Sequence, residues 1–276
     1  MKITASQVND LRKKTGAGMM DCKKALVEAE GDEQAAIDIL RKKGQKVAAK
    51  RGDNETKEGL VIAKVSNTGK DGVILSLSCE TDFVAKNDDF YALVDSLVDV
   101  AAESGADNVD AFMNEKYDSS LTVAEKITEQ IGVIGEKLEI SNLDKVHSEA
   151  VVAYNHPGNQ IASLVALSKE GDAAMDAGKQ VAMQVAAMAP LALDKEGIDQ
   201  ETIDREIEVG KELAIQEGKP ADMAEKIAMG RLNKFFKENT LLSQAFIKDN
   251  KKSVEQFLKE TEDGLTVVDF KRVALK

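Results

Sequence analysis

Residues 58–79 read EGLVIAKVSNTGKDGVILSLSC and contain two apolar runs on either side of a polar stretch. The runs, 60–65 and 73–77, are rich in Val, Ile and Leu, which favour β-strands. The stretch between them, 67–72, reads NTGKDG and is typical of a hairpin turn. A helix is predicted directly afterwards, because apolar residues recur at helical spacing at Phe90, Leu93, Val94, Leu97, Val98 and Ala101.

The same order of elements returns about ninety residues later. Residues 149–154 (EAVVAY) resemble 58–63 (EGLVIA), and the polar turn becomes 155–159 (NHPGN). The second apolar run, 162–167, is followed by a predicted helix at 173–188. Self-similarity at this spacing indicates a duplicated unit. We therefore predict an α+β core made of two hairpin-plus-helix subdomains packed side by side.

The first fifty residues have a different pattern. Gly16, Gly18 and Gly31 divide residues 4–50 into three segments, each with apolar side chains at helical spacing. This arrangement predicts a compact three-helix module. The stretch 51–58 contains no apolar side chain and is predicted to be a linker with few contacts across it.

Residues 199–238 predict two antiparallel helices. Asp199 suits a helix N-cap, and the chain reverses at 218–220 (GKP). A hairpin of two helices has little core of its own, so it should pack against the body of the protein or pair with a second copy, which would make a homodimer. Further along, 253–256 forms a capping box for a short helix, and 265–275 is strand-like.

These patterns divide the chain into four predicted units. They are a partner-docking module at 1–52, a core subdomain at 53–145 with additional helices at 109–113 and 123–134, a second core subdomain made of 146–198 and 239–276, and the helical hairpin at 199–238.

The charge of the chain restricts its partners. The 276 residues carry 37 Lys and Arg against 49 Asp and Glu, a net charge of −12, which disfavours direct binding of nucleic acid or of an anionic membrane. Residues 1–52 are the exception, with 12 basic and 7 acidic residues, so this module is expected to meet an acidic partner. The chain has neither an apolar run of about 20 residues nor a signal-like start, which predicts a cytoplasmic protein.

Residues typical of catalytic sites are scarce. No phosphate-binding glycine loop is present, and the two histidines, His147 and His156, are too few for a metal cluster. Cys22 and Cys79 have no neighbouring cysteine and are predicted to be reduced thiols. We therefore expect no cofactor and no covalent chemistry, with a thiol enzyme that uses Cys79 as an open alternative.

The segment 78–87, SCETDFVAKN, places an acid and an aromatic directly after an apolar strand. In one interpretation, Thr81 and Asp82 form a turn and Phe83 is an inward anchor. In the other, Phe83 is an exposed wedge for a partner. Because only 11 of the 276 residues are aromatic, an aromatic side chain in a loop is informative.

Two segments resemble the signature sequences of the bacterial elongation factor Ts family. They are residues 11–26, LRKKTGAGMMDCKKAL, and residues 79–86, CETDFVAK. The resemblance covers nearly the whole chain and is strongest over residues 1–90. It implies a ubiquitin-associated-like three-helix module, a duplicated α+β core and a projecting helical hairpin.

Proteins of this family are exchange factors for the translational GTPase elongation factor Tu. The resemblance implies that the chain binds this GTPase with GDP or without nucleotide, and promotes GDP release by displacing magnesium and phosphate contacts so that GTP can rebind. It also implies which residues meet the GTPase: an exchange loop of Thr81, Asp82, Phe83 and Val84, and docking residues Arg12, Met19 and Met20.

One position departs from the family pattern. Where the family has a Met-His-Val-Ala run, this chain reads Met183-Gln184-Val185-Ala186, so a further contact would pass to the Gln184 amide or be absent. The alternative function is a helical-module adaptor or holdase, in which the basic module captures acidic or apolar segments without exchange activity.

Overall fold

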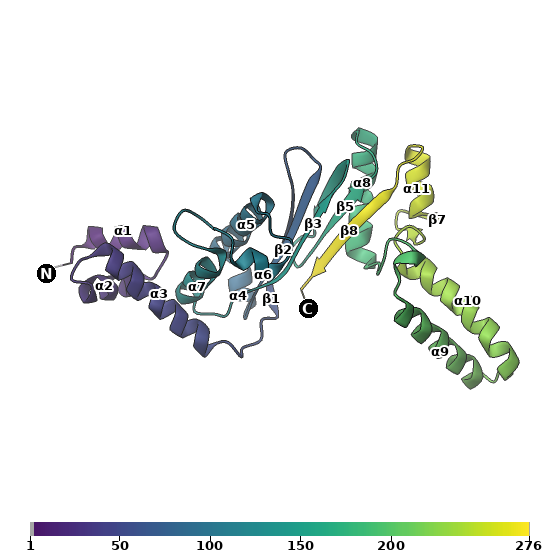
Figure 1. Cartoon of the computed structure of the whole chain (residues 1–276), viewed down its shortest axis with the longest axis horizontal. Helices are drawn as coiled ribbons and strands as arrows, with labels where there is room; N and C mark the ends of the chain where they lie inside the picture. Colours follow the sequence, from purple (N-terminus) through teal and green to yellow (C-terminus); the bar gives the residue numbers. More distant parts are fainter. Residues whose placement is uncertain (1–2, 276) are drawn as a thin grey trace.

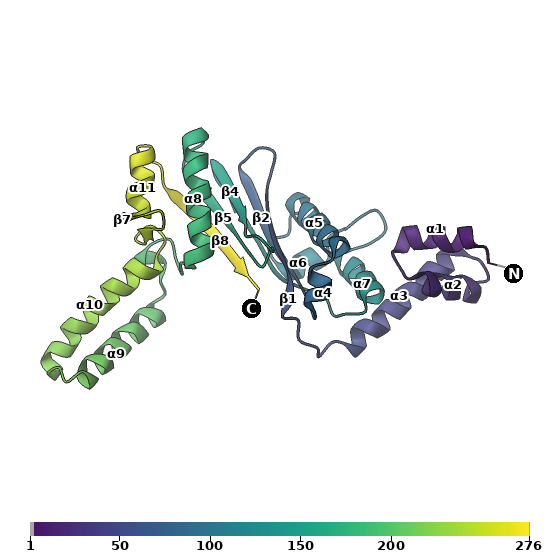
Figure 2. The ribbon, with the colours of Figure 1, turned by 180° about the vertical axis from the view of Figure 1, so that it is seen from behind.

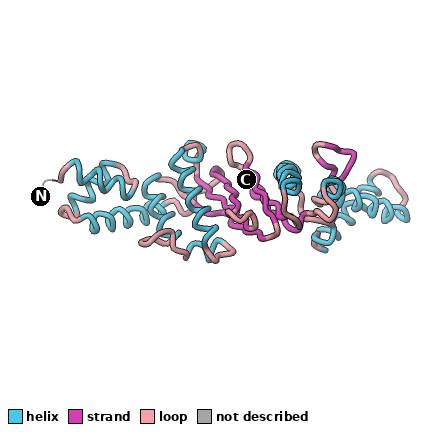
Figure 3. Tube along the Cα trace, turned by 90° about the horizontal axis from the view of Figure 1, so that it is seen from above, coloured by secondary structure: helices cyan, strands magenta, loops and turns pink. Residues whose placement is uncertain are grey.

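The computed structural model describes residues 3–275, with the backbone alone for residues 221 and 222. The molecule is elongated, with a helical module at one end, a helical hairpin at the other and antiparallel sheets between them (Figures 1 and 3). The mixture of helices and small sheets confirms the predicted α+β class.

Three helices form the N-terminal module: α1 (Ala5–Thr15), α2 (Met19–Glu28) and α3 (Glu33–Lys50). Thr4 and Gln7 form a capping box before α1, and the Asp32 carboxylate accepts a hydrogen bond from the backbone N–H of Ala35 at the start of α3. Small and apolar side chains fill the centre of the module: Val8, Leu11, Ala17, Cys22, Ala25, Leu26 and Ala36.

The expectation of few contacts between this module and the core is wrong. Helix α3 is 18 residues long and packs along α7 (Val123–Ile134) of the core. The two helices approach closely at Gly44 and Gly132, where a Cβ added to Gly132 would lie 2.7 Å from the Cα of Gly44. Val47 and Ala48 of α3 pack against the hydrophobic core of the first subdomain. Periodicity identifies an apolar face, but it does not identify what that face covers.

The first half of the core is a three-stranded antiparallel sheet in the order β1 (Glu58–Val65), β2 (Asp71–Cys79) and β3 (Glu139–His147). The second half repeats this arrangement. Its order is β4 (Ala150–Asn155), β5 (Ile161–Leu167) and β8 (Val267–Ala274). Both predicted hairpins are confirmed, whereas β3 was not predicted from the sequence.

The two sheets face each other between two helical layers (Figures 1 and 2). Helix α5 (Asp88–Glu103) covers the outer face of the first sheet, and α8 (Asp172–Met188) covers that of the second. Alternate residues of β1 therefore point to different cores, with Leu60 toward α5 and Val61 toward the second sheet. Burial on both faces explains why the strands are continuously apolar. The predicted helices α6 (Val109–Met113) and α7 are present as well.

Helices α9 (Gln200–Gln216) and α10 (Ala221–Asn239) form the predicted hairpin, which projects from the second sheet (Figure 1). Small residues bring the helices together, since a Cβ added to Gly210 would lie 3.1 Å from the Cα of Ala228. Pro220 is the N-cap of α10, directly after the predicted chain reversal.

The remaining elements lie between the hairpin helices and the second sheet. A short 3-10 helix (Lys195–Gly197) precedes α9. After α10 come β6 (Ala245–Phe246), β7 (Asp249–Ser253) and α11 (Val254–Thr261), the last with the predicted capping box of Ser253 and Gln256. That the four predicted units fold as separate domains remains a prediction.

Candidate partner-docking site

A four-residue helix, α4 (Asp82–Ala85), follows the end of β2 and carries an exposed phenylalanine. The side chain of Phe83 is 84% exposed. The interpretation of Phe83 as an inward anchor is therefore wrong, and the segment is a helical turn instead of an open loop. Burying a phenylalanine is worth about 2 kcal/mol, so its exposure requires a restraint on the surrounding chain.

The neighbours of Phe83 provide part of this restraint. Val84 and Ala85 pack against the hydrophobic core of the first half, which leaves Phe83 on the opposite side of the short helix. Thr81 is the N-cap of α4, and its Oγ1 accepts a hydrogen bond from the backbone N–H of Val84 at 3.4 Å. The helix therefore turns Phe83 outward because its other apolar side chains turn inward.

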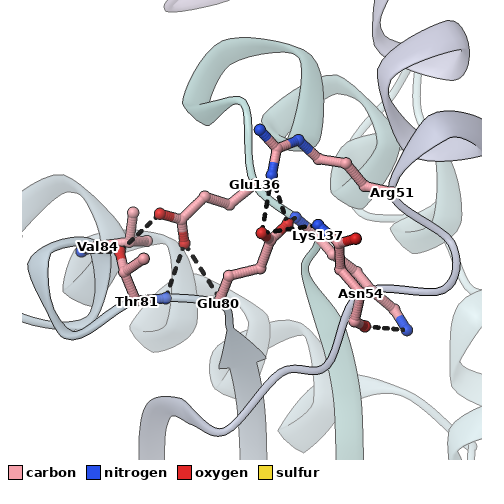
Figure 4. A network of polar contacts seen from close by, with 7 residues as sticks. All are labelled: Arg51, Asn54, Glu80, Thr81, Val84, Glu136 and Lys137. Carbon is pink, nitrogen blue, oxygen red and sulfur yellow. Dashed lines mark hydrogen bonds and ion pairs between the residues drawn. The ribbon is translucent and has the colours of Figure 1, made fainter.

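Glu136 holds the start of α4 from a distant part of the sequence (Figure 4). One carboxylate oxygen, Oε2, accepts hydrogen bonds from the backbone N–H groups of Glu80 and Thr81, both at 3.1 Å. The other oxygen, Oε1, accepts from the Thr81 hydroxyl at 2.6 Å. One carboxylate therefore receives three hydrogen bonds from two consecutive residues before Phe83, and bonds to a charged acceptor are the stronger kind.

Glu80 is the second carboxylate in this network (Figure 4). Its oxygens accept from Arg51 Nη1 at 2.7 and 2.9 Å, from Asn54 Nδ2 at 2.9 Å and from the Lys137 backbone N–H at 2.5 Å. Burial disfavours the charged carboxylate, but the hydrogen bonds from Lys137, Asn54 and Arg51 outweigh it and lower the pKa of Glu80. Glu80 is therefore charged at neutral pH and joins α3, the linker and the residues after α7.

Asp82 has a different environment from the other two carboxylates. It is half-exposed and pairs with Lys86 one turn later at 2.6 Å, and this hydrogen bond lowers the pKa of Asp82. Exposed pairs of this spacing contribute little to stability. Asp82 is therefore free to exchange Lys86 for a group on a partner.

Cys79 does not have the properties of a nucleophile. Its side chain is buried, and burial together with the nearby Glu136 carboxylate raises the pKa of the thiol to about 12. A thiolate is the reactive form, so the thiol is inert at neutral pH. The environment of Cys79 therefore disfavours the alternative of a thiol enzyme.

The predicted docking residues lie on the N-terminal module. Met19 and Met20 begin α2 and are 59% and 62% exposed, and Arg12 is exposed on α1. Val27, seven residues after Met20, shares its helix face and is 58% exposed. Val27 was not among the predicted docking residues, although its helical spacing from Met20 is a signal that could have identified it.

Gln184, the possible further contact, makes internal hydrogen bonds in the structure. The side chain is fully buried on α8. Its Nε2 donates to Gln244 Oε1 at 3.2 Å and to the Ala245 carbonyl at 3.1 Å, and its Oε1 accepts from the Ile247 N–H at 2.9 Å. Gln184 therefore fixes the segment 244–247 to α8, and a partner cannot touch its amide in this conformation.

The residues that restrain α4 were also missed by sequence analysis. Arg51, Glu136 and Lys137 lie 29, 56 and 57 residues from Glu80 along the chain. They were assigned to a linker or to no element, because no local pattern marks a charged residue as buried in a network. Only the packing of α3 on α7 brings them together.

Two other kinds of site, a metal centre and a membrane span, are absent from the described part of the chain. Residues 3–275 contain no group of three or more His, Cys, Asp and Glu side chains that could hold a metal ion. Within the same residues, no helix is both long and apolar enough to cross a bilayer. The exposed apolar side chains on α2 and α4 are among those on the surface of the described residues that a partner could contact.

An exposed phenylalanine restrained by two carboxylates, with a second exposed apolar face on a basic helical module, is typical of a protein that binds another protein. The sequence model of the family described as Elongation factor TS matches residues 80–276. The chain belongs to the elongation factor Ts family and is therefore a translation elongation factor.

Curated relatives match along nearly the full length of the chain. It is 54% identical over 274 residues to Elongation factor Ts of Christiangramia forsetii, with 99% of each chain covered. It is 49% identical over 274 residues to Elongation factor Ts of Amoebophilus asiaticus, again with 99% of each covered. The identity to Elongation factor Ts of Porphyromonas gingivalis is 42% over 277 residues, or 100% of this chain and 99% of that one.

Proposed function

We propose that this protein is a guanine nucleotide exchange factor for elongation factor Tu, which it binds with GDP or without nucleotide. The observation that carries the proposal is the exposure of Phe83 on a helix that two carboxylates restrain. An apolar side chain held in solvent is ready to enter a pocket without a large loss of conformational entropy. The exchange loop comprises Thr81, Asp82, Phe83 and Val84.

Exchange needs no bond chemistry, only unequal binding of two states. A GTPase holds GDP through backbone amides around the phosphates and a bridging magnesium ion. Suppose that Phe83 fits only the conformation in which these contacts are displaced. Binding of the factor then lowers the affinity of the GTPase for GDP, and GDP lowers its affinity for the factor by the same ratio. The incoming GTP then releases the factor.

Arg12, Met19 and Met20 supply docking energy in this proposal. They lie on the module that carries positive charge in an otherwise acidic chain, which suits an acidic face of the GTPase. Direct nucleic-acid and membrane contacts have no place in this function, which belongs to the cytoplasm. A second copy of the chain paired through 199–238 remains a prediction.

The test compares an exposed apolar residue in the first half of the core with one on the distant helical hairpin. Phe83→Ala should slow stimulated release of a fluorescent GDP analogue about a hundredfold, because the wedge carries the differential binding. Leu213→Ala on α9, 41% exposed, is the matched control and should leave the rate unchanged. Equal rates for the two variants would contradict the proposal.

A selectivity measurement separates the proposal from the adaptor alternative. Capture from a cell extract should retain the GTPase selectively when GDP is absent. Retention of many unrelated proteins, unaffected by GDP, would favour an adaptor or holdase.

A further inference from the structure

We propose that Glu136 is a positioning residue for the exchange loop, and that with Glu80 it joins this loop to the N-terminal docking module as one rigid unit. The inference rests on the proposed function, because it gives Glu136 and Glu80 the role of positioning Phe83 through the hydrogen bonds that they make in the segment before it. It is carried by contacts between α3, α7 and α4 that are far apart in sequence (Figure 4).

The first step is the packing of α3 on α7. A Cβ added to Gly44 would lie 2.7 Å from the carbonyl oxygen of Thr128, and one added to Gly132 would lie 2.7 Å from Gly44 Cα. Backbones this close leave no room to slide without a clash. In addition, Val133 of α7 packs against the core of the N-terminal module. The module is therefore held to α7 and not only tethered by the linker.

The second step is the end of α7. The helix stops at Gly135, which has a φ of 83°, a left-handed conformation that glycine adopts without strain. Glu136 and Lys137 follow at once, so their positions are set by the helix. The Glu136 carboxylate then receives the backbone N–H groups of Glu80 and Thr81 and the Thr81 hydroxyl.

The third step closes the network from α3. Arg51 is the C-cap of α3 and donates to both oxygens of Glu80, whose side chain is 15% exposed. Lys137 donates its backbone N–H to Glu80, and its Nζ binds the carbonyl oxygens of Gly52 and Asn54 at 3.0 and 3.1 Å. The exchange loop is therefore held by α3 on one side and by the residues after α7 on the other.

In such a rigid unit, docking of the N-terminal module also fixes the position of Phe83 relative to the partner. If α4 could move relative to α2, a factor docked through Met19 and Met20 would leave Phe83 free to point away from its pocket. With α4 fixed, docking places Phe83 at the pocket with no further ordering, which is the physical benefit of preorganisation. Loss of the restraint should therefore lower the maximal exchange rate more than it lowers docking affinity.

The test measures the GDP-release rate against the concentration of the factor for Glu136→Ala. We expect the maximal rate to fall about tenfold while the half-saturating concentration changes less than about twofold. Glu136→Gln should keep at least about half of the rate, since its amide oxygen can still accept both backbone N–H groups. Glu103→Ala, which removes an exposed carboxylate in the last turn of α5, is the matched control and should match the parent.

A double substitution shows whether Glu136 acts through Phe83. In a Phe83→Ala background, Glu136→Ala should cause no further loss of rate, because the group it positions is gone. Independent, multiplying losses would overturn the positioning role. A Phe83→Ala protein with the parent rate would instead reject the proposed function itself, so the two failures can be told apart.

A second variant covers the case in which Glu136→Ala fails to fold. Arg51→Met keeps an aliphatic side chain but removes both bonds to Glu80. It should lower the maximal rate about threefold, again with little change in the half-saturating concentration. A parent-like maximal rate for Arg51→Met and for a folded Glu136→Gln, Thr81→Val double variant would overturn the proposal.

Discussion

The two halves of the core share a scaffold and differ at one junction. In each half, a hairpin is followed by a helix, and a later strand joins the central strand of the sheet. Each half also has a register shift near the end of its central strand, between Ser76 and Leu77 in one and between Ala166 and Leu167 in the other. The duplicated unit thus includes a third strand and a bulge.

The difference lies between the central strand and the helix that follows. In the first half, β2 leads into Glu80, Thr81 and α4, which presents Phe83 before α5 begins. In the second half, β5 reaches α8 within four residues and presents no aromatic side chain. Ser168 at this junction binds the Gly264 carbonyl and the Thr266 N–H. The comparison teaches that the scaffold is duplicated, whereas Phe83 and its short helix lie in a segment that the second half lacks.

The largest predicted effect is the difference in stability between alanine substitutions at two phenylalanines of the first half. Phe90 is 2% exposed in the core and Phe83 is 84% exposed. Phe90→Ala should cost about 3 to 5 kcal/mol of stability, because a cavity is left behind. Phe83→Ala should stay within about 0.5 kcal/mol, although it loses exchange activity. Chemical denaturation monitored by circular dichroism measures both, and a Phe83→Ala protein as unstable as Phe90→Ala would break the comparison.

Removal of residues 1–52 should affect the two halves unequally. Association with the GTPase should weaken at least about tenfold, since the docking residues are lost. Val47, Ala48 and Arg51 are removed as well, so the first sheet loses part of its cover and the second does not. Amide hydrogen exchange should show weaker protection in β1–β3 than in β4, β5 and β8. Equal loss of protection in both sheets, or unimpaired association, would contradict this prediction.

Substitution of Gln184 tests how much a buried polar side chain contributes to the stability of the second half. Gln184→Ala removes three hydrogen bonds and leaves the Ile247 N–H without this acceptor, which should cost about 1 to 3 kcal/mol. Thermal unfolding measures this loss, and Gln180→Ala, one turn earlier on α8, is the control. A variant with parent stability but reduced GTPase binding would restore Gln184 as a partner contact.

Acid should loosen the junction of the first half. The pKa of Glu80 is lowered in the folded protein, so its charge stabilises the fold at pH values above the ordinary value of 4.5. This contribution is lost as the pH falls below 4.5 through the folded pKa. Hydrogen exchange at residues 80–84 should therefore rise in acid, and Glu80→Gln should make this rise smaller. An unchanged acid response in Glu80→Gln would contradict the assignment.

The smallest effect on exchange should come from the hairpin. Residues 191–193 and 239–242 are hydrogen-bonded side by side, so residues 199–238 can be replaced by a short Gly-Ser linker. Exchange should remain within about threefold of the parent, because Phe83 and Met20 lie elsewhere. Sedimentation of both proteins tests whether the hairpin pairs two copies of the chain, which is one of the two alternatives that the sequence leaves open. Abolished exchange in the folded excision variant would place the function in the second half.

Much of the fold was predictable because it depends on local patterns. Strand runs, turn residues and helix caps act over a few residues, so the hairpins, α5, α8 and the capping box at Ser253 could be located from the sequence. The strand β3 could not, because its burial pattern is interrupted by exposed residues. The resemblance in residues 79–86 identified the segment that carries Phe83, but physical reasoning alone left its exposure open.

The sequence by itself determined the α+β class, the duplication, the charged module and the position of the aromatic residue after a strand. Only the tertiary structure decided that Phe83 points to solvent, that Gln184 is internal, and that Glu136 meets Thr81. The physical reason is the separation along the chain of the residues that interact. Periodicity and capping depend on neighbours along the chain, whereas burial and a carboxylate's hydrogen bonds depend on which distant segments packing brings within about 3 Å.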